Sequence, residues 1–198
     1  SFRPNAMSDP TSTTQPKTAV VPSNPSGPLD WRRLVQWLLA DGVITAEEAQ
    51  RTVARCSQAE STQHPLVRLA NVGMARAGDG RALDIEELTQ YLATRSGMAY
   101  LRIDPLRVDA GRVGEIMSAS YAERHKVLPV QVSPQEVVVA TAEPFIEDWV
   151  AEVERQARRK VRRVLASPLD LKRYTGEFFA LAKSVRAAEK AGGAASAA

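Results

Sequence analysis

The sequence predicts an α+β fold with α/β-like layers, in which a helical N-terminal subdomain precedes a small sheet packed with helices. Between residues 29 and 97, apolar residues recur at the spacing of amphipathic helices. After residue 98, the short valine-rich runs VLPVQV and VVVATA have the composition of strands. The order strand, strand, helix, strand, helix in the second half then indicates a sheet covered by helices.

The first two helices form a predicted hairpin. The segment LDWRRLVQWLLADG begins after Asp30, whose carboxylate suits a helix N-cap, and ends at Gly42. Thr45 followed by Ala-Glu-Glu is typical of a second helix start. We expect this second helix to extend from about Ala46 to Gln58 and to bury Ala49, Val53 and Cys56.

A second helical hairpin follows after a polar break. Its first helix begins with Pro65, a residue favoured in the first turn, and its second helix, IEELTQYLATRSG, follows Asp84 as N-cap and ends at Gly97. The two hairpins form an approximate internal repeat of residues 33–58 and 65–97, with residues 78–81 as an insertion in the second copy.

The sheet region begins with the β-prone segment MAYLRID and two short helical stretches, at Arg112–Met117 and Ser120–Arg124. Strands at 127–132 and 137–142, joined by four residues, predict an antiparallel hairpin. A helix in IEDWVAEVERQAR, a third strand in KVRRVLA and a last helix after Ser167 follow. We expect that last helix to bury Leu171, Tyr174, Phe178, Phe179 and Leu181.

The two ends differ from the rest in composition. Residues 1–28 carry six prolines among Ser, Thr and Asn, so we expect a disordered leader, with residues 1–6 a remnant ahead of a native start at Met7. Residues 187–198, ending AGGAASAA, suggest a flexible tail. The predicted organisation is a leader (1–28), a helical subdomain (29–97), an α/β module (98–186) and a tail (187–198).

Composition and motifs exclude several classes of function. No run of apolar residues approaches the length of a membrane span and no secretory signal is present, so we expect a cytoplasmic protein. The sequence has no GxxxxGK[ST], GxGxxG, GxSxG or HExxH motif. We therefore expect no catalytic residue, no cofactor and no metal in this segment.

Three residues outside these motifs have side chains that could carry chemistry. Cys56 falls where the second helix needs an apolar residue, so we expect a small core residue rather than a nucleophile. We expect His125, at a helix end beside Lys126, to cap carbonyl groups. His64, before Pro65, is expected in a loop.

A run of arginines is the strongest charge feature. It comprises Arg155, Arg158, Arg159, Arg162 and Arg163, with Lys160 among them. Acidic residues precede the run, and cations suit a helix C-terminus, so a solvated surface is one interpretation. A partner-docking face is the second. A basic nucleic-acid-binding module is the third, but aromatic residues that would stack on bases are missing, so no nucleic acid is expected.

The segment from Ser120 to Tyr174 resembles the N-terminal domain that precedes the motor in type II secretion and type IV pilus-assembly ATPases, as in general secretory pathway protein E. The likeness lies in YAERHKVLPV, then VVVATAEPF, then a tryptophan-bearing helix, then KVRRVLASPLDLKRY, with RSGMAYLRIDPLRVD ahead of them. The resemblance implies a compact α/β module. It also implies a regulatory domain that binds the cytoplasmic domain of an inner-membrane platform protein and acts on a C-terminal ATPase domain in cis.

Some members of this family, those with the MshEN-type domain, bind cyclic di-GMP through two copies of a motif like RLGxxLxxxG followed by spaced leucines and a glutamine. In the first copy the resemblance assigns ligand contacts to Arg33, Leu34 and Gly42, but Val35 replaces the first glycine and Cys56 the glutamine. In the second copy Arg95 stands at the glutamine position. Side chains replace glycines where the backbone should approach the ligand, so the motifs are degenerate.

The sequence thus leads to a non-catalytic docking and regulatory domain as the first hypothesis, located in the cytoplasm and peripheral to the inner membrane through its partner. A cyclic di-GMP sensor is the first alternative, and a nucleic-acid-binding module is the second.

Overall fold

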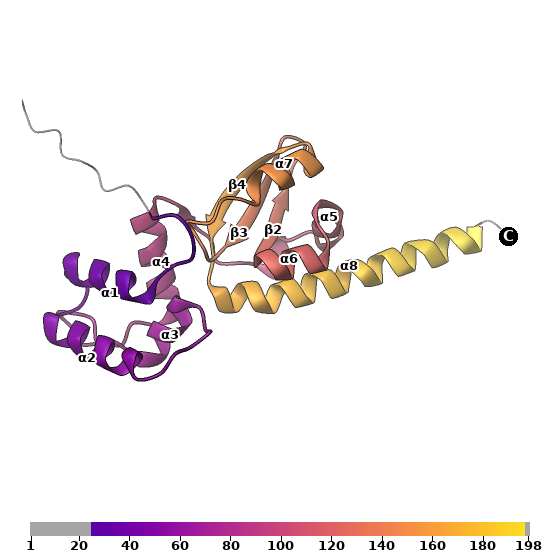
Figure 1. Ribbon diagram of the computed structural model, residues 1–198. Coiled ribbons are helices and arrows are strands. Elements are labelled where there is room, and N and C mark those ends of the chain that lie inside the picture. Colours follow the sequence, from indigo (N-terminus) through magenta and orange to yellow (C-terminus); the bar gives the residue numbers. More distant parts are fainter. Residues whose placement is uncertain (1–24, 197–198) are drawn as a thin grey trace, which may run out of the picture.

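The computed structural model of the protein describes residues 25–196, with side chains placed through residue 193, and has four helices followed by a four-stranded sheet with further helices (Figure 1). This arrangement confirms the predicted α+β fold. The expectations of a remnant at residues 1–6 and of disorder in the leader up to residue 24 lie outside the described residues. No helix within 25–196 is long and apolar enough to cross a bilayer.

The four helices of the helical subdomain begin at the positions that the sequence predicts. Its helices are α1 (Trp31–Ala40), α2 (Ala46–Ser57), α3 (Pro65–Val72) and α4 (Ile85–Ser96). The side chains of Asp30 and Thr45 accept hydrogen bonds from backbone N–H groups in the first turns of α1 and α2. Asp84 and Glu87 form a reciprocal capping box at the start of α4. These local contacts explain why the helix starts could be predicted from sequence.

Packing within this subdomain corrects one prediction. Val53, expected in the core, is 39% exposed, while its neighbour Thr52 is fully buried. The buried face of α2 is set by Ala49, Thr52 and Cys56, which recur every three or four residues. Val53 lies one position beyond that face, so its side chain lies at the surface. The expectation that Cys56 is a buried core residue is confirmed.

The sheet has the order β1-β4-β3-β2, with strands β1 (Ala99–Tyr100), β2 (Val127–Val132), β3 (Glu136–Thr141) and β4 (Lys160–Leu165). The predicted antiparallel hairpin is confirmed as β2 and β3, and its register shifts between Pro129 and Gln131. β4 pairs parallel to β3 and to the short β1. β2 therefore forms one edge of the sheet.

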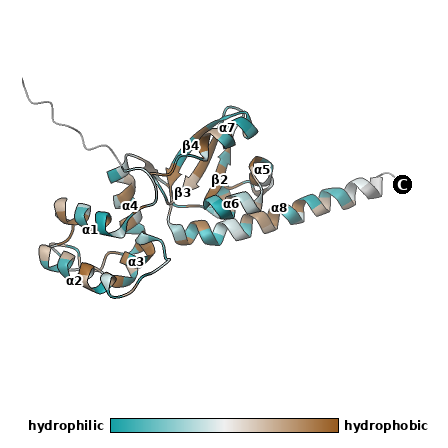
Figure 2. Cartoon of the chain, in the orientation of Figure 1, coloured by the Kyte–Doolittle hydropathy of each residue, from teal (hydrophilic) through white to brown (hydrophobic). Residues whose placement is uncertain are grey.

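Helices cover both faces of the sheet. The elements are the short 3₁₀ turn η1 (Pro105–Arg107) and the helices α5 (Ala110–Ile116), α6 (Ala119–His125), α7 (Val150–Ala157) and α8 (Pro168–Ser196). One core joins Val138 and Val164 of the sheet to α5 and α8, and another joins Val137 and Val139 to α7. Figure 2 shows hydrophobic stretches in the strands, whereas α8 alternates between hydrophobic and hydrophilic residues.

α8 departs from the sequence prediction at two points. Leu181, expected in the core, is 54% exposed, because the covered face of the helix passes through Phe178 and Ala182 instead. The helix also continues to Ser196, past residue 186 where we expected the fold to end, and its second half extends away from the sheet (Figure 1). Alanine is the best helix former, and the segment 187–196 is rich in it.

The loop after β3 joins the two subdomains. Phe145 in this loop belongs to the core of the helical subdomain, and its ring contacts Trp37 edge-on with centroids 5.9 Å apart. The carbonyl of Phe145 also accepts a hydrogen bond from the N–H of Gly27 at 3.0 Å. Apolar contacts thus fix the helical subdomain against one end of the sheet.

Candidate functional site

The structure divides the predicted arginine run between the two faces of the sheet. Successive side chains of a strand point to opposite faces. In β4, Arg162 pairs in register with Val138, whose side chain faces α8, and Arg163 pairs with Val139, whose side chain faces α7. A run that is continuous in sequence is therefore two surfaces in space.

Two arginines of the run serve the fold itself. Arg163 donates from Nη1 to the carbonyl of Pro144 at 2.9 Å and from Nη2 to Oε1 of Glu147 at 2.6 Å, and its side chain is mostly covered. Arg159 donates from Nη1 to the carbonyl of Ala157 at 3.2 Å. These contacts hold the loop after β3 and the end of α7.

The other members of the run, Arg155, Arg158 and Arg162, are exposed and lie with Lys160 where α7 ends and β4 begins. We call these four residues the basic tip. Arg158 is the C-cap of α7 and has a left-handed backbone conformation, with φ +53°. Its positive charge is favourable at this position, because the C-terminus of a helix carries partial negative charge. Within residues 25–196 the side chains of Arg155 and Arg158 have no ion pair or hydrogen bond, whereas Arg162 donates from Nε to Glu136 at 2.8 Å.

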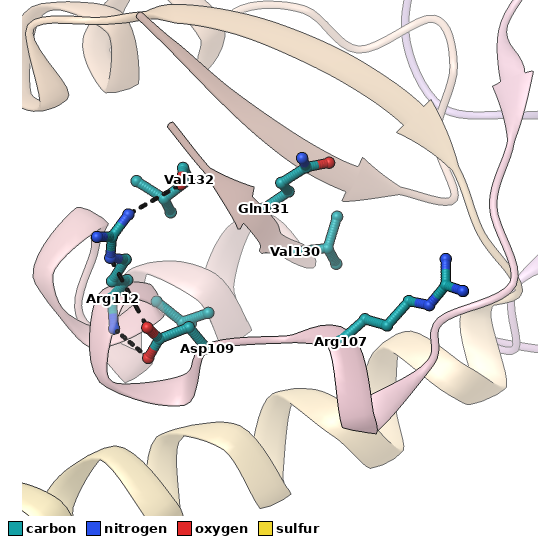
Figure 3. A pocket seen from close by; sticks show the side chains of 7 residues that line it. Arg107, Asp109, Arg112, Val130, Gln131 and Val132 are labelled. Carbon is teal, nitrogen blue, oxygen red and sulfur yellow. Dashed lines mark hydrogen bonds and ion pairs between the residues drawn. The ribbon is translucent and has the colours of Figure 1, made fainter. Parts of the chain in front are cut away.

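The strand register links the basic tip to the edge of the sheet. The register pairs Arg162 of β4 with Val138 of β3, and Val138 with Gln131 of β2. These three residues therefore form a row across the face of the sheet that α8 covers. Gln131 is exposed and lines a small pocket of about 120 Å³. The pocket lies between β2 and the segment of η1 and α5, and is lined by Arg107, Asp109, Arg112, Val113, Val130, Gln131 and Val132 (Figure 3).

The polar groups of the pocket are positioned by the start of α5. Asp109 is the N-cap of this helix and accepts hydrogen bonds from the N–H groups of Gly111 and Arg112. Arg112 donates from Nη1 to the carbonyl of Val132 at 3.2 Å, and its Nε lies 3.7 Å from Asp109. Arg107 lies on the opposite side of the opening, where its side chain points away from Asp109 and Arg112 (Figure 3) and its Nε lies 3.5 Å from Asp104. Sequence reasoning missed Arg107, Arg112 and Gln131, because only the folded chain brings them together.

The residues assigned to a ligand by resemblance differ in their surroundings. Arg33 is exposed on α1, whereas the neighbouring Leu34 is fully buried in the core of the helical subdomain. Gly42 has φ +71° just after α1, a conformation that glycine adopts without strain. Val35, which replaces the motif glycine, is 2% exposed and packs in the same core. The side chains of Leu34 and Val35 are therefore part of this core.

Arg95, at the second glutamine position, is engaged by the first hairpin. Its Nη1 lies 3.0 and 2.9 Å from the two carboxylate oxygens of Asp41, beside Gly42, and its guanidinium lies over the ring of Trp37. The hydroxyl of Tyr91 donates to the same carboxylate at 2.5 Å. The hydrogen bond from Tyr91 and then the charge of Arg95 lower the pKa of Asp41, and burial, with Asp41 nearby, raises the pKa of Tyr91.

His64 lies in a loop, as predicted, whereas His125 differs from its predicted role. His64 is the N-cap of α3: its Nδ1 accepts from the N–H of Leu66, and its Nε2 lies 2.9 Å from the carbonyl of Ala142 at the end of β3. From the loop ahead of α3 it therefore bridges the helical subdomain and the sheet. His125 stacks on Tyr121 with ring centroids 4.2 Å apart, and no carbonyl contact of its ring is found in residues 25–196. Within these residues no group of three side chains could hold a metal ion.

Comparisons with known proteins agree with this architecture. Residues 96–185, the sheet and its helices, match the MshEN domain family. The chain is 32% identical over 168 residues to the type IV pilus assembly ATPase TfpB of Acinetobacter baylyi, a match that covers 82% of this chain and 28% of TfpB. It is 29% identical over 134 residues to bacteriophage adsorption protein B of Escherichia coli K12, covering 68% of this chain and 16% of that protein.

A solved structure extends the likeness to the fold. The structure of MshE with cdg matches 74% of this chain and 98% of the MshE chain, with a TM-score of 0.54 and 16% sequence identity. At that identity the match shows a shared fold. The present chain spans just over a quarter of the length of TfpB.

Proposed function

We propose that this chain is a docking and regulatory domain of a type II secretion or type IV pilus-assembly ATPase. The proposal is supported by the match of residues 96–185 to the MshEN domain family and by the similarity of the chain to the type IV pilus assembly ATPase TfpB. In this proposal it binds the cytoplasmic domain of an inner-membrane platform protein and passes the assembly state to an ATPase domain in cis. The segment itself is non-catalytic and acts in the cytoplasm, at the inner membrane through its partner.

The basic tip is the observation that carries the proposal. Arg155 and Arg158 are exposed cations without an acidic partner in residues 25–196, and they follow one another around the end of α7. Charges arranged in this way increase the rate of association with an acidic partner and fix its orientation. A domain that docks through this surface presents it to an acidic patch on the platform protein.

The experiment measures binding of the full 198-residue chain to the purified cytoplasmic domains of the platform proteins encoded in the same genome. Biolayer interferometry is expected to find one domain that binds, and the double variant Arg155→Glu with Arg158→Glu is expected to weaken that binding by about tenfold or more. Lys183→Glu, which makes the same charge change on the exposed part of α8, is the matched control. Absence of binding to every platform domain would overturn the proposal.

The likeness to MshE favours a second candidate, a cyclic di-GMP sensor, because MshE was solved with cdg and shares this fold. Three features weigh against it. Leu34 is buried, Val35 places a core side chain where the motif has glycine, and Arg95 is bound to Asp41. Isothermal titration calorimetry of the full chain decides the matter: saturable heat with cyclic di-GMP would establish the sensor, and no heat at high micromolar ligand would remove it.

A further inference from the structure

The last helix of the domain continues beyond the sheet that it covers. α8 has 29 residues, and its first part packs on α5, where Arg186 donates from Nη2 to the carbonyl of Gly114 at 2.6 Å. Residues 187–193 are all exposed, and this part of the helix extends away from the rest of the domain (Figure 1). One end of α8 is therefore held by the fold, and the other end is open to a partner.

Apolar residues repeat along α8 in the pattern of a coiled coil. They alternate in steps of three and four residues, as in a heptad with apolar residues at positions a and d. The residues are Leu171, Tyr174, Phe178, Leu181, Val185 and Ala188. The first three are buried in the core between α8 and the sheet, whereas Leu181 is 54% exposed, Val185 is 38% exposed and Ala188 is exposed. We call the last three residues the seam.

The geometry of the repeat explains why the seam leaves the covered face of α8. A seven-residue repeat drifts by about 20° per heptad around a straight α-helix. The line of apolar residues therefore turns away from the sheet as it passes along the helix, and Leu181 lies beside the covered face that contains Phe178 and Ala182. From Leu181 onward the line is open to a second helix.

The seam is complementary in size to a second copy of itself. Its larger residues, Leu181 and Val185, lie nearer the sheet, and the small residues Ala188 and Gly192 follow on the same line. One antiparallel register places Val185 of one copy against Ala188 of the other. The same register places Leu181 against Gly192. Each larger side chain then meets a small residue, so the two helices can approach closely and interdigitate.

The charges beside the seam suit the same register. Within residues 25–196 Glu189 has no ion pair, and Arg186 uses one of its five donors on Gly114. In the antiparallel register Glu189 of one copy and Arg186 of the other lie on the same side of the helix pair, about 3 Å apart along its axis. Twofold symmetry makes this contact twice.

The fold itself selects the antiparallel direction. In a parallel pair the two sheets lie at the same end of the helices, where each sheet already covers the apolar line at Tyr174 and Phe178. In an antiparallel pair the two sheets lie at opposite ends, and only the free halves of the helices meet.

We propose that α8 pairs in antiparallel orientation with α8 of a second copy of this chain, through the seam of Leu181, Val185 and Ala188. The pair covers the exposed apolar side chains of both copies. One helix against one helix buries less than the roughly 1,200 Å² of stable complexes, so the association is weak and depends on concentration. The inference goes beyond the proposed docking function and does not depend on it.

Sedimentation equilibrium of the full 198-residue chain tests the pairing. From about 10 µM to about 1 mM, the range of weak association, it is expected to show a monomer–dimer equilibrium. Leu181→Glu and Ala188→Glu place a charge on the seam of both copies, and each is expected to weaken dimerisation by about tenfold or more. Lys183→Glu makes a charge change on the opposite side of the same helix and is the control.

The variants separate loss of pairing from loss of folding. Leu181 is exposed, and Ala188 lies beyond the part of α8 that packs on α5, so both substitutions leave the core intact. Circular dichroism verifies the fold of each variant. A chain that stays monomeric up to the highest concentration leaves the seam to some other helix and overturns the inference, as does a dimer that neither seam variant weakens.

Cysteine cross-linking tests the direction of the pair. A disulfide needs Cα atoms within about 7 Å, so mild oxidation of Val185→Cys mixed with Ala188→Cys should link the two variants. Leu181→Cys alone should form no disulfide, because in the antiparallel pair its two copies lie about 16 Å apart along the axis. The native Cys56 is buried and does not compete. A disulfide between two chains of Leu181→Cys would show a parallel pair and overturn the proposed arrangement.

Discussion

Arg95 binds Asp41 with a single nitrogen placed 3.0 and 2.9 Å from the two carboxylate oxygens, and so joins the second helical hairpin to the loop that ends α1 in the first. Tyr91, one turn earlier on α4, donates to the same carboxylate. The loop beside Gly42 is thereby closed by the protein's own side chains. A nucleotide that used this loop and the Arg95 position would have to displace an ion pair.

The first prediction concerns this ion pair. We expect Asp41→Asn to lower the free energy of unfolding by about 0.5–1 kcal/mol near pH 7, the range of partly exposed pairs. Because the hydrogen bond from Tyr91 and the charge of Arg95 lower the pKa of folded Asp41 from its ordinary 3.8, the carboxylate stabilises the fold above that value. The contribution is lost as the pH falls through the folded pKa.

Urea unfolding of both proteins at about pH 7 and about pH 2 measures this difference. The gap between wild type and Asp41→Asn should narrow at the lower pH. Asp148→Asn, at an exposed aspartate without a described ion pair, should show a smaller gap at both. A gap that persists unchanged in acid would show that the carboxylate charge is not what stabilises this loop.

The second prediction separates core residues from ligand residues in the degenerate motif. Leu34 is fully buried, and truncation of such a leucine leaves a cavity, so Leu34→Ala should lower the free energy of unfolding by about 2–5 kcal/mol. Its neighbour Arg33 is exposed, and Arg33→Ala should change stability by less than about 0.5 kcal/mol. Chemical denaturation distinguishes them, and equal effects of the two substitutions would contradict the assignment of Leu34 to the core.

The fold was largely predictable because its helix starts depend on local chemistry. Asp30, Thr45 and Asp84 bind backbone N–H groups two or three residues away, so their sequence context carries the information. Burial was less predictable where an apolar residue continues the helical pattern beyond the covered face. Val53 and Leu181 show this, since the neighbour that covers a helix face is remote in sequence.

The candidate site was predictable only in part. The sequence indicates a basic run, but the surroundings of Arg162 and Arg163 depend on which helices cover each face of the sheet. The pocket is formed jointly by three elements: the turn at residues 105–107, the start of a helix at Asp109, and β2 at the edge of the sheet. No spacing within the sequence links Arg107 to Gln131, because strand order and register bring them together.

The third prediction compares the two histidines. His64 accepts from Leu66 and contacts the carbonyl of Ala142, so His64→Ala should cost about 1–3 kcal/mol through two lost hydrogen bonds and a buried carbonyl left without this partner. His125→Ala removes mainly a ring contact with Tyr121 and should cost about 1 kcal/mol or less. Thermal unfolding of both variants measures the difference. An equal cost would show that His64 does not hold the two subdomains together.

The fourth prediction uses a buried hydroxyl. Thr52 is fully buried on α2, and its Oγ1 has no hydrogen-bond partner in residues 25–196. Thr52→Val keeps the shape of the side chain and removes an unsatisfied polar group, so we expect it to raise the free energy of unfolding by about 1 kcal/mol. Valine and threonine have similar helix propensities, so the backbone contributes little to the difference.

The neighbouring position is the matched control for this substitution. Val53→Thr introduces at a partly exposed site the same chemical change in the opposite direction, and there water can satisfy the added hydroxyl. We expect a change below about 0.5 kcal/mol. Urea denaturation of the two variants and the wild type compares the three proteins. If Thr52→Val is less stable than the wild type, the Thr52 hydroxyl has a partner in the folded protein, such as a buried water, and that hydrogen bond stabilises α2.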